Sequence, residues 1–86
     1  MITSHAETKA DIKAYIMNEF LPGEDPDELE DTTPLITGGI LDSISTVKLV
    51  AFLEEHFGVQ FQAYEMNADY LDTIALIAET VESKQA

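Results

Sequence analysis

Hydrophobic residues recur at intervals of three and four along several segments of the chain, and polar stretches separate these segments. The first apolar stripe consists of Ile12, Tyr15, Ile16 and Phe20. This spacing is typical of one face of an amphipathic helix. Ser4 and Glu7 fit a capping box, and Pro22-Gly23 cannot continue a helix. The pattern therefore predicts a helix that begins after Thr3 or Ser4 and stops before Pro22.

The second segment, from Gly38 to Gly58, is the centre of the chain. Its two leading glycines allow a sharp turn, and Asp42 is a strong N-cap candidate because its carboxylate can accept from the free amides of a first helical turn. This places Ser43 at the exposed start of a long helix. The stripe of that helix predicted to face the core consists of Thr46, Leu49, Val50, Leu53 and Phe57.

The opposite side of this second helix is not the fully polar surface of a helix that packs on one side only. It carries three apolar residues among charged ones, namely Ile44, Val47, Lys48, Ala51 and Glu55. We interpret this face as a surface for an external partner. Burial of Ile44 and Val47 against the preceding loop is the alternative.

A long connection, Glu24 to Gly39, separates the two helices. Six acids occupy the eight positions from Glu24 to Asp31, which predicts a solvated loop. Leu35 and Ile36 are expected to pin the loop to the core. Long connections in small domains tend to be functional or disordered, and this one leads directly to Asp42-Ser43, which favours function.

The chain after Gly58 predicts a loop with Val59 and Phe61 turned inward, then one short helical turn within Glu65 to Tyr70. Met66 and Tyr70 are expected to be core residues beneath that turn. Thr73 is expected to cap a final helix with one apolar side, formed by Ile74, Ile77, Ala78 and Val81. The ends, residues 1–4 and 83–86, are expected to fray.

These elements predict one all-α domain over residues 1–86, a small four-helix bundle with three main helices and one short helix. The formal charge is −13, from 17 acidic and four basic residues. Such a charge disfavours nucleic acid and anionic membranes as partners and favours proteins with basic patches. The chain has no cysteine, which excludes a disulfide and a thiolate nucleophile or ligand. We predict no metal site.

The amino terminus lacks the basic region and apolar run of a signal peptide, and no stretch approaches the roughly 20 apolar residues of a membrane span. We therefore expect a cytoplasmic protein without a membrane span. We also expect a monomer.

Three roles compete for Ser43: a hydrolase nucleophile, a capping hydroxyl and a site of covalent modification. A nucleophile needs a nearby base, but His56 lies thirteen residues further along the same helix, about 20 Å away at 1.5 Å rise per residue. Nothing in the sequence brings His5 to Ser43, and the segment does not match a G-x-S-x-G elbow. A phosphate ester, in contrast, would be stabilised by the amides and the dipole at a helix start.

Three stretches in the second half of the chain carry a family resemblance: Leu41-Asp42-Ser43-Ile44, Thr46-Val47-Lys48-Leu49-Val50 and Leu53-Glu54-Glu55-His56-Phe57-Gly58-Val59. Together with the length, acidity and helix order, they resemble the carrier protein family, which includes acyl, peptidyl and D-alanyl carriers. The resemblance covers nearly the whole chain. The segments Tyr64-Glu65-Met66-Asn67 and Tyr70-Leu71-Asp72-Thr73 look closer to D-alanyl and other free-standing aminoacyl carriers.

The resemblance implies that Ser43 accepts a 4′-phosphopantetheine group from coenzyme A, whose thiol then carries an acyl or aminoacyl group as a thioester. It also implies that Asp42 helps the phosphopantetheinyl transferase and its bound metal, and that partners read Ile44, Val47, Lys48 and Ala51. The fatty acid carriers typically have an acid around Lys48, so this lysine puts interchange with their enzymes in doubt.

The implied partners are the transferase, an acyl- or aminoacyl-loading ligase, and downstream synthase or transferase enzymes of a biosynthetic pathway, with basic docking patches. The protein itself is expected to be a carrier and not an enzyme. Its cargo, pathway and loading enzyme stay open. The alternative function is an unmodified acidic helical interaction module that uses the stripe of Ile44, Val47 and Ala51.

Overall fold

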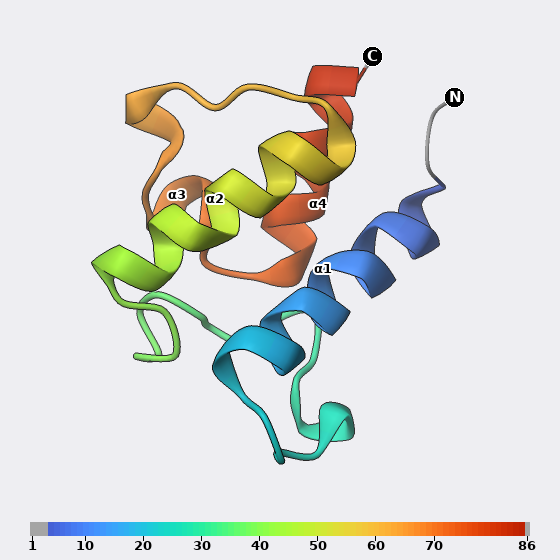
Figure 1. The fold of residues 1–86 in the computed structure, drawn as a ribbon, viewed down its shortest axis with the longest axis vertical. Coiled ribbons are helices and arrows are strands. Elements are labelled where there is room, and N and C mark those ends of the chain that lie inside the picture. The colour runs from blue at the N-terminus through green and yellow to red at the C-terminus, as the bar shows by residue number, and fades with distance from the viewer. Residues whose placement is uncertain (1–3, 86) are drawn as a thin grey trace.

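The computed structural model describes residues 4–85, which form an all-helical fold without a strand (Figure 1). Four α-helices follow in order: α1 (His5–Phe20), α2 (Ser43–Phe57), α3 (Ala68–Leu71) and α4 (Ile74–Gln85). Two short 3-10 helices, η1 (Pro26–Glu28) and η2 (Ala63–Glu65), lie in the connections. Three main helices and one short helix confirm the predicted fold class.

Helix α1 has the predicted boundaries because its caps act locally. The Ser4 hydroxyl accepts from the Glu7 amide at 3.2 Å, and the helix ends at Phe20, two residues before Pro22. Ile12 and Ile16 are fully buried, while Tyr15 is half-buried. The predicted stripe is therefore the core face of this helix.

The core lies where α1, α2 and α4 meet, with α4 packed against both α1 and α3. The predicted stripe of α4 is fully buried, and the Thr73 hydroxyl accepts from the Leu76 amide at 3.1 Å, as expected for a cap. On α2, Leu49 and Leu53 are fully buried. Figure 1 shows α2 running diagonally across the molecule in front of α4, so one of its sides can face outward.

The two connections contain more helix than the sequence predicts. The acidic loop includes η1, which starts after Asp25 because the Asp25 carboxylate accepts from the Asp27 amide at 2.9 Å. The single short turn predicted within Glu65 to Tyr70 corresponds to α3, which begins at Ala68 and extends one residue further, to Leu71, whereas the sequence does not predict η2, which ends at Glu65. Asn67 separates the two because its side chain caps α3, accepting from Asp69 at 2.8 Å.

The expected fraying of residues 83–86 is wrong for residues 83–85, since α4 continues through Ser83 and Lys84 to Gln85. The Lys84 ammonium lies 2.7 Å from the buried Glu65 carboxylate and 5.0 Å from the centre of the Phe61 ring. These contacts hold the last turn against η2. Ser4 is likewise ordered as the N-cap of α1; residues 1–3 and Ala86 lie outside the described residues.

Candidate functional site

The loop before α2 is tied to the start of α4 by one side chain, Asp72. One carboxylate oxygen accepts from the backbone amides of Ile36 and Thr37, each at 2.8 Å, and the other accepts from the Thr37 hydroxyl at 2.8 Å. The Asp72 carbonyl also accepts from the Leu35 amide at 2.6 Å. Hydrogen bonding, chiefly from the Thr37 amide, lowers the pKa of the Asp72 carboxyl. Asp72 therefore anchors the segment that leads to Ser43.

The sequence did not reveal this role of Asp72, although it placed the residue beside the Thr73 cap. It did predict the anchoring of Leu35, which is fully buried, and of Ile36, which is half-buried. The acids Glu24 to Glu28 are exposed as predicted.

Both glycines of the hinge are required by its geometry. A Cβ at position 38 would lie 2.2 Å from the Pro34 carbonyl oxygen, which is backbone and cannot move aside cheaply. Gly39 has φ of +85°, in the left-handed region that other residues rarely adopt. The chain then turns back, and the Leu41 amide donates to the Leu35 carbonyl at 2.8 Å. This close turn aims the start of α2 outward.

Asp42 is the N-cap of α2, as predicted. Its Oδ1 accepts from the Ser45 amide at 2.7 Å, and this bond is the main cause of a lowered pKa for the Asp42 carboxyl. The Thr46 hydroxyl donates to the Asp42 carbonyl at 2.7 Å. Ser43 is the first residue of α2 and is exposed. An ionised carboxylate and an accessible hydroxyl therefore stand side by side at a helix start.

An open groove of about 510 Å³ runs beside Ser43 between α2 and α3. Its lining is mostly apolar and comes from the hinge, α2 and the start of α3: Ile36, Leu41, Asp42, Ser43, Thr46, Val47, Met66, Asn67 and Ala68. Met66 and Tyr70 are half-buried against the core, as expected, and Met66 also faces this groove. An elongated substituent on the serine would have an apolar surface to lie against.

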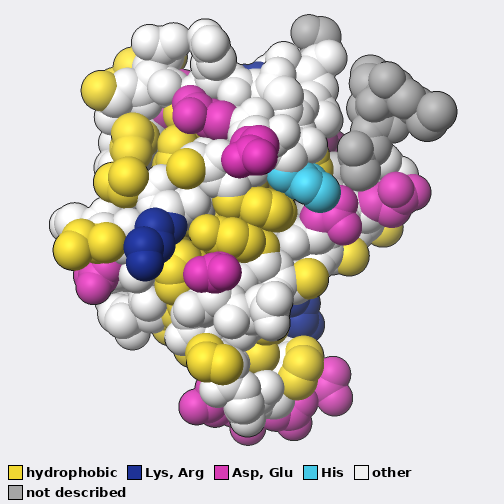
Figure 2. Space-filling model, viewed as in Figure 1, with side chains coloured by type: hydrophobic (Ala, Val, Ile, Leu, Met, Phe, Trp, Pro, Cys, Tyr) yellow, Lys and Arg dark blue, Asp and Glu magenta, His cyan; other side chains and the backbone are white. Residues whose placement is uncertain are grey.

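The outward face of α2 is exposed along its whole length. Ile44 and Val47 retain 70% and 56% of their surface, and Lys48, Ala51 and Glu55 are also exposed. Burial of Ile44 and Val47 against the loop is therefore wrong. Figure 2 shows hydrophobic side chains gathered over α2 with acidic ones around them. Monomeric soluble proteins rarely expose such stripes without an interaction to serve.

The two histidines are engaged elsewhere. His5 pairs with Glu82 of α4, and His56, near the end of α2, lies 3.1 Å from Asp11 of α1 and stacks on Phe52. Ser43 therefore has no histidine base beside it, in agreement with the argument against a hydrolase.

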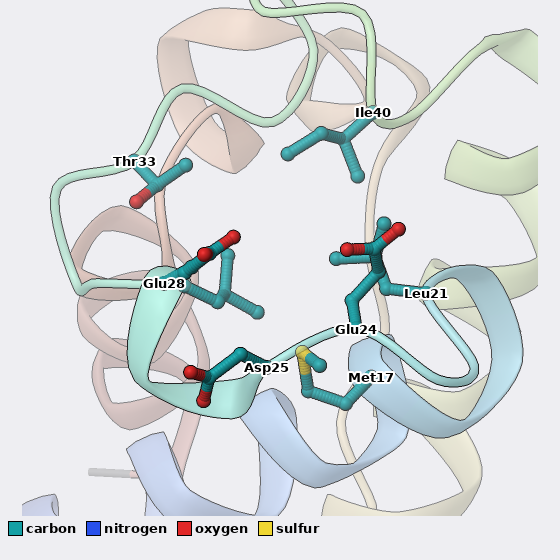
Figure 3. A pocket seen from close by; sticks show the side chains of 8 residues that line it. Met17, Leu21, Glu24, Asp25, Glu28, Thr33 and Ile40 are labelled. Carbon is teal, nitrogen blue, oxygen red and sulfur yellow. The ribbon is translucent and has the colours of Figure 1, made fainter.

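A second, smaller pocket of about 160 Å³ lies between the end of α1, η1 and the loop (Figure 3). Met17, Leu21, Leu29 and Ile40 supply its apolar lining, with the carboxylates of Glu24, Asp25 and Glu28 around it. It includes neither Asp42 nor Ser43, so it is separate from the hinge serine.

Across residues 4–85, the His, Asp and Glu side chains form no group of three or more arranged to hold a metal ion. In the same part of the chain, every helix is too short or too polar to cross a membrane.

Comparison with known proteins agrees with this geometry. Residues 18–81 match the family described as "Phosphopantetheine attachment site". The chain is also similar to a D-alanyl carrier protein of Leuconostoc citreum (strain KM20), with 34% identity over 68 residues. That alignment covers 79% of this chain and 85% of the relative.

Proposed function

This chain belongs to the phosphopantetheine-attachment family of carrier proteins, and from that premise we propose that Ser43 is the residue that bears its covalent 4′-phosphopantetheine. The observation that carries the proposal is the exposed hydroxyl of Ser43 at the first residue of α2, next to an ionised Asp42 and at the edge of an apolar groove. A cofactor of this shape fits the site, since its phosphodiester would meet the helix start and its chain the groove.

Attachment is a phosphoryl transfer to the serine. The Ser43 oxygen forms a bond to the phosphorus that carries the pantetheine in coenzyme A, and the pyrophosphate P–O bond on the other side of that phosphorus breaks. The hydroxyl proton passes to a base of the transferase, and 3′,5′-adenosine bisphosphate leaves. The Asp42 carboxylate, whose Oδ1 accepts from the Ser45 amide, would help the transferase and the metal ion that the transferase brings. Once bound, the arm supplies the thiol on which cargo is held as a thioester.

We propose that the cargo is an aminoacyl group, with D-alanine the first candidate because the similar protein is a D-alanyl carrier protein. The chain makes no bond itself. It presents the activated group to a loading ligase and then to a downstream enzyme of a biosynthetic pathway, and the tether replaces free diffusion by a high local concentration.

Partner enzymes are proposed to dock on the outward face of α2, formed by Ile44, Val47, Lys48 and Ala51. The apolar members supply contact area beside Ser43. The formal charge of −13 steers basic surfaces toward the molecule and speeds short-lived encounters.

Intact mass spectrometry tests the attachment. Apo protein is incubated with coenzyme A, Mg²⁺ and a broad-specificity phosphopantetheinyl transferase. We expect the wild type and the control Ser45→Ala to gain one phosphopantetheine and Ser43→Ala to gain none, with unchanged helical circular dichroism. A gain in Ser43→Ala would refute the assignment. An unmodified wild type with intact helices would instead favour the plain interaction module.

The cargo is tested on the holo protein with ATP and a D-alanine–carrier ligase. We expect a mass gain of one alanyl group that hydroxylamine removes, as it removes a thioester. Loading with fatty acyl groups by an acyl-carrier synthetase, and not with D-alanine, would contradict the aminoacyl assignment and leave the attachment at Ser43 intact.

A further inference from the structure

Lys48 interrupts the apolar stripe of α2. It lies four residues after Ile44 and three before Ala51, so the three side chains share the outward face. Lys48 is exposed. In a chain with 17 acidic and four basic residues, a positive charge in the middle of this face is unusual.

Lys48 has no acidic partner within the described part of the chain. The positions three and four residues away on its own helix are Ile44, Ser45, Ala51 and Phe52. The lysines that form ion pairs between residues 4 and 85 are Lys9, with Asp31, and Lys84, with Glu65. The next acid on the outward face, Glu55, is seven residues away, or about 10 Å along the helix axis. Within the described residues, the Lys48 ammonium therefore forms no ion pair.

Docking changes this situation, because contact over Ile44 and Val47 removes water from the surface between and around them. A desolvated ammonium without a partner is costly, and a like charge opposite it is costlier still. The acids around the face attract basic groups at the rim of a partner's surface. Lys48, at the centre of the face, instead needs an acidic group opposite it. The chemistry of a fitting partner therefore differs between rim and centre.

Resting on the proposed carrier function, we propose that Lys48 is a specificity-determining residue of the docking face. It selects partner enzymes that place a carboxylate opposite the middle of α2, inside an apolar contact with a basic rim. It rejects enzymes whose carrier-binding surface is basic throughout, since such a surface sets a lysine or arginine against it.

The first test uses a phosphopantetheinyl transferase whose carrier-binding surface is basic throughout. The value of kcat/KM is measured by mass spectrometry for the wild type, Lys48→Glu and Lys48→Gln. We expect Lys48→Glu to raise kcat/KM about tenfold, because it replaces repulsion by attraction. Lys48→Gln only removes the repulsion, so its kcat/KM should lie between those of the wild type and Lys48→Glu. The matched control is Lys13→Glu on α1, which changes the net charge equally and should stay within about twofold of the wild type. High salt should shrink the difference.

The reciprocal test changes the enzyme. A photo-crosslinking amino acid at position 51 identifies the basic transferase side chain that faces the middle of α2, and that residue is replaced by glutamate. The altered transferase should prefer the wild type over Lys48→Glu, which reverses the order.

Equal or lower kcat/KM for Lys48→Glu with the original transferase, an equal gain in Lys13→Glu, or no reversal with the altered transferase would overturn the inference. A wild type that never gains the arm, even on long incubation, would instead overturn the proposed function on which the inference rests.

Discussion

Replacing Asp72 by alanine should release the loop that carries the chain to Ser43. The change removes three hydrogen bonds from one carboxylate, two to the amides of Ile36 and Thr37 and one to the Thr37 hydroxyl. Hydrogen bonds to charged groups are worth about 1.5–3 kcal/mol each when water is excluded. Both Thr37 groups lie at the surface, where water replaces much of the loss, while the Ile36 amide is part-buried. We therefore expect the free energy of unfolding to fall by roughly 2–3 kcal/mol in total.

For a domain of this size, that loss corresponds to a decrease in Tm of roughly 10–20 °C. Thermal and urea unfolding followed by circular dichroism at pH 7 measure it. Asp72→Asn keeps one acceptor oxygen and should lose about half as much. The matched control is Asp69→Ala, which removes an exposed acid from α3, the short helix that ends just before Asp72. Hydrogen exchange should show the amides of Ile36 and Thr37 losing protection only in the Asp72 variants.

The same bonds predict a pH dependence with a definite sign. They lower the pKa of the Asp72 carboxyl below its ordinary value of 3.8, so the folded state binds this proton less readily than the unfolded state. The stabilisation is therefore complete above the ordinary pKa and is lost as the pH falls through the lowered one. The stability gap between the wild type and Asp72→Ala should close over that acidic range. A gap that stays constant there, or a loss at pH 7 no larger than that of Asp69→Ala, would refute the anchoring role.

Three further substitutions test the hinge and the contact of Lys84 with Glu65. Gly38→Ala should lower the free energy of unfolding by about 2 kcal/mol or more, since the new Cβ meets the Pro34 carbonyl oxygen. The Cβ of Gly39→Ala meets no atom, so this variant should lose about 1 kcal/mol from backbone strain alone. Urea unfolding that ranks the two variants in the opposite order would contradict the steric argument. Lys84→Met should make the amides in the last turn of α4 exchange faster, because it removes the ion pair with the buried Glu65. Hydrogen exchange that leaves residues 83–85 protected would show that packing alone holds this turn.

The sequence alone determined the elements whose causes are local. Ser4, Asp42 and Thr73 were identified as helix caps because a cap bonds to an amide two or three residues away, and such a bond depends only on spacing. The apolar stripes of α1, α2 and α4 were likewise readable from the period of the helix. The placement of Ser43 at the exposed start of α2 follows from these local rules. The exposure of Ile44 and Val47 does not, because the sequence leaves their burial against the preceding loop open and only the tertiary structure decides against it.

Only the tertiary structure decided how the hinge is held and how the chain ends. Asp72 contacts Thr37 across 35 residues of sequence, and Lys84 reaches Glu65 across 19. No spacing rule connects such pairs, because their meeting depends on how α4 packs against the rest of the core. The groove beside Ser43 has the same origin, since it needs Met66 and Ala68 to lie next to α2. Local hydrogen bonding thus set where the helices begin and end, and packing between distant segments set what surrounds the serine.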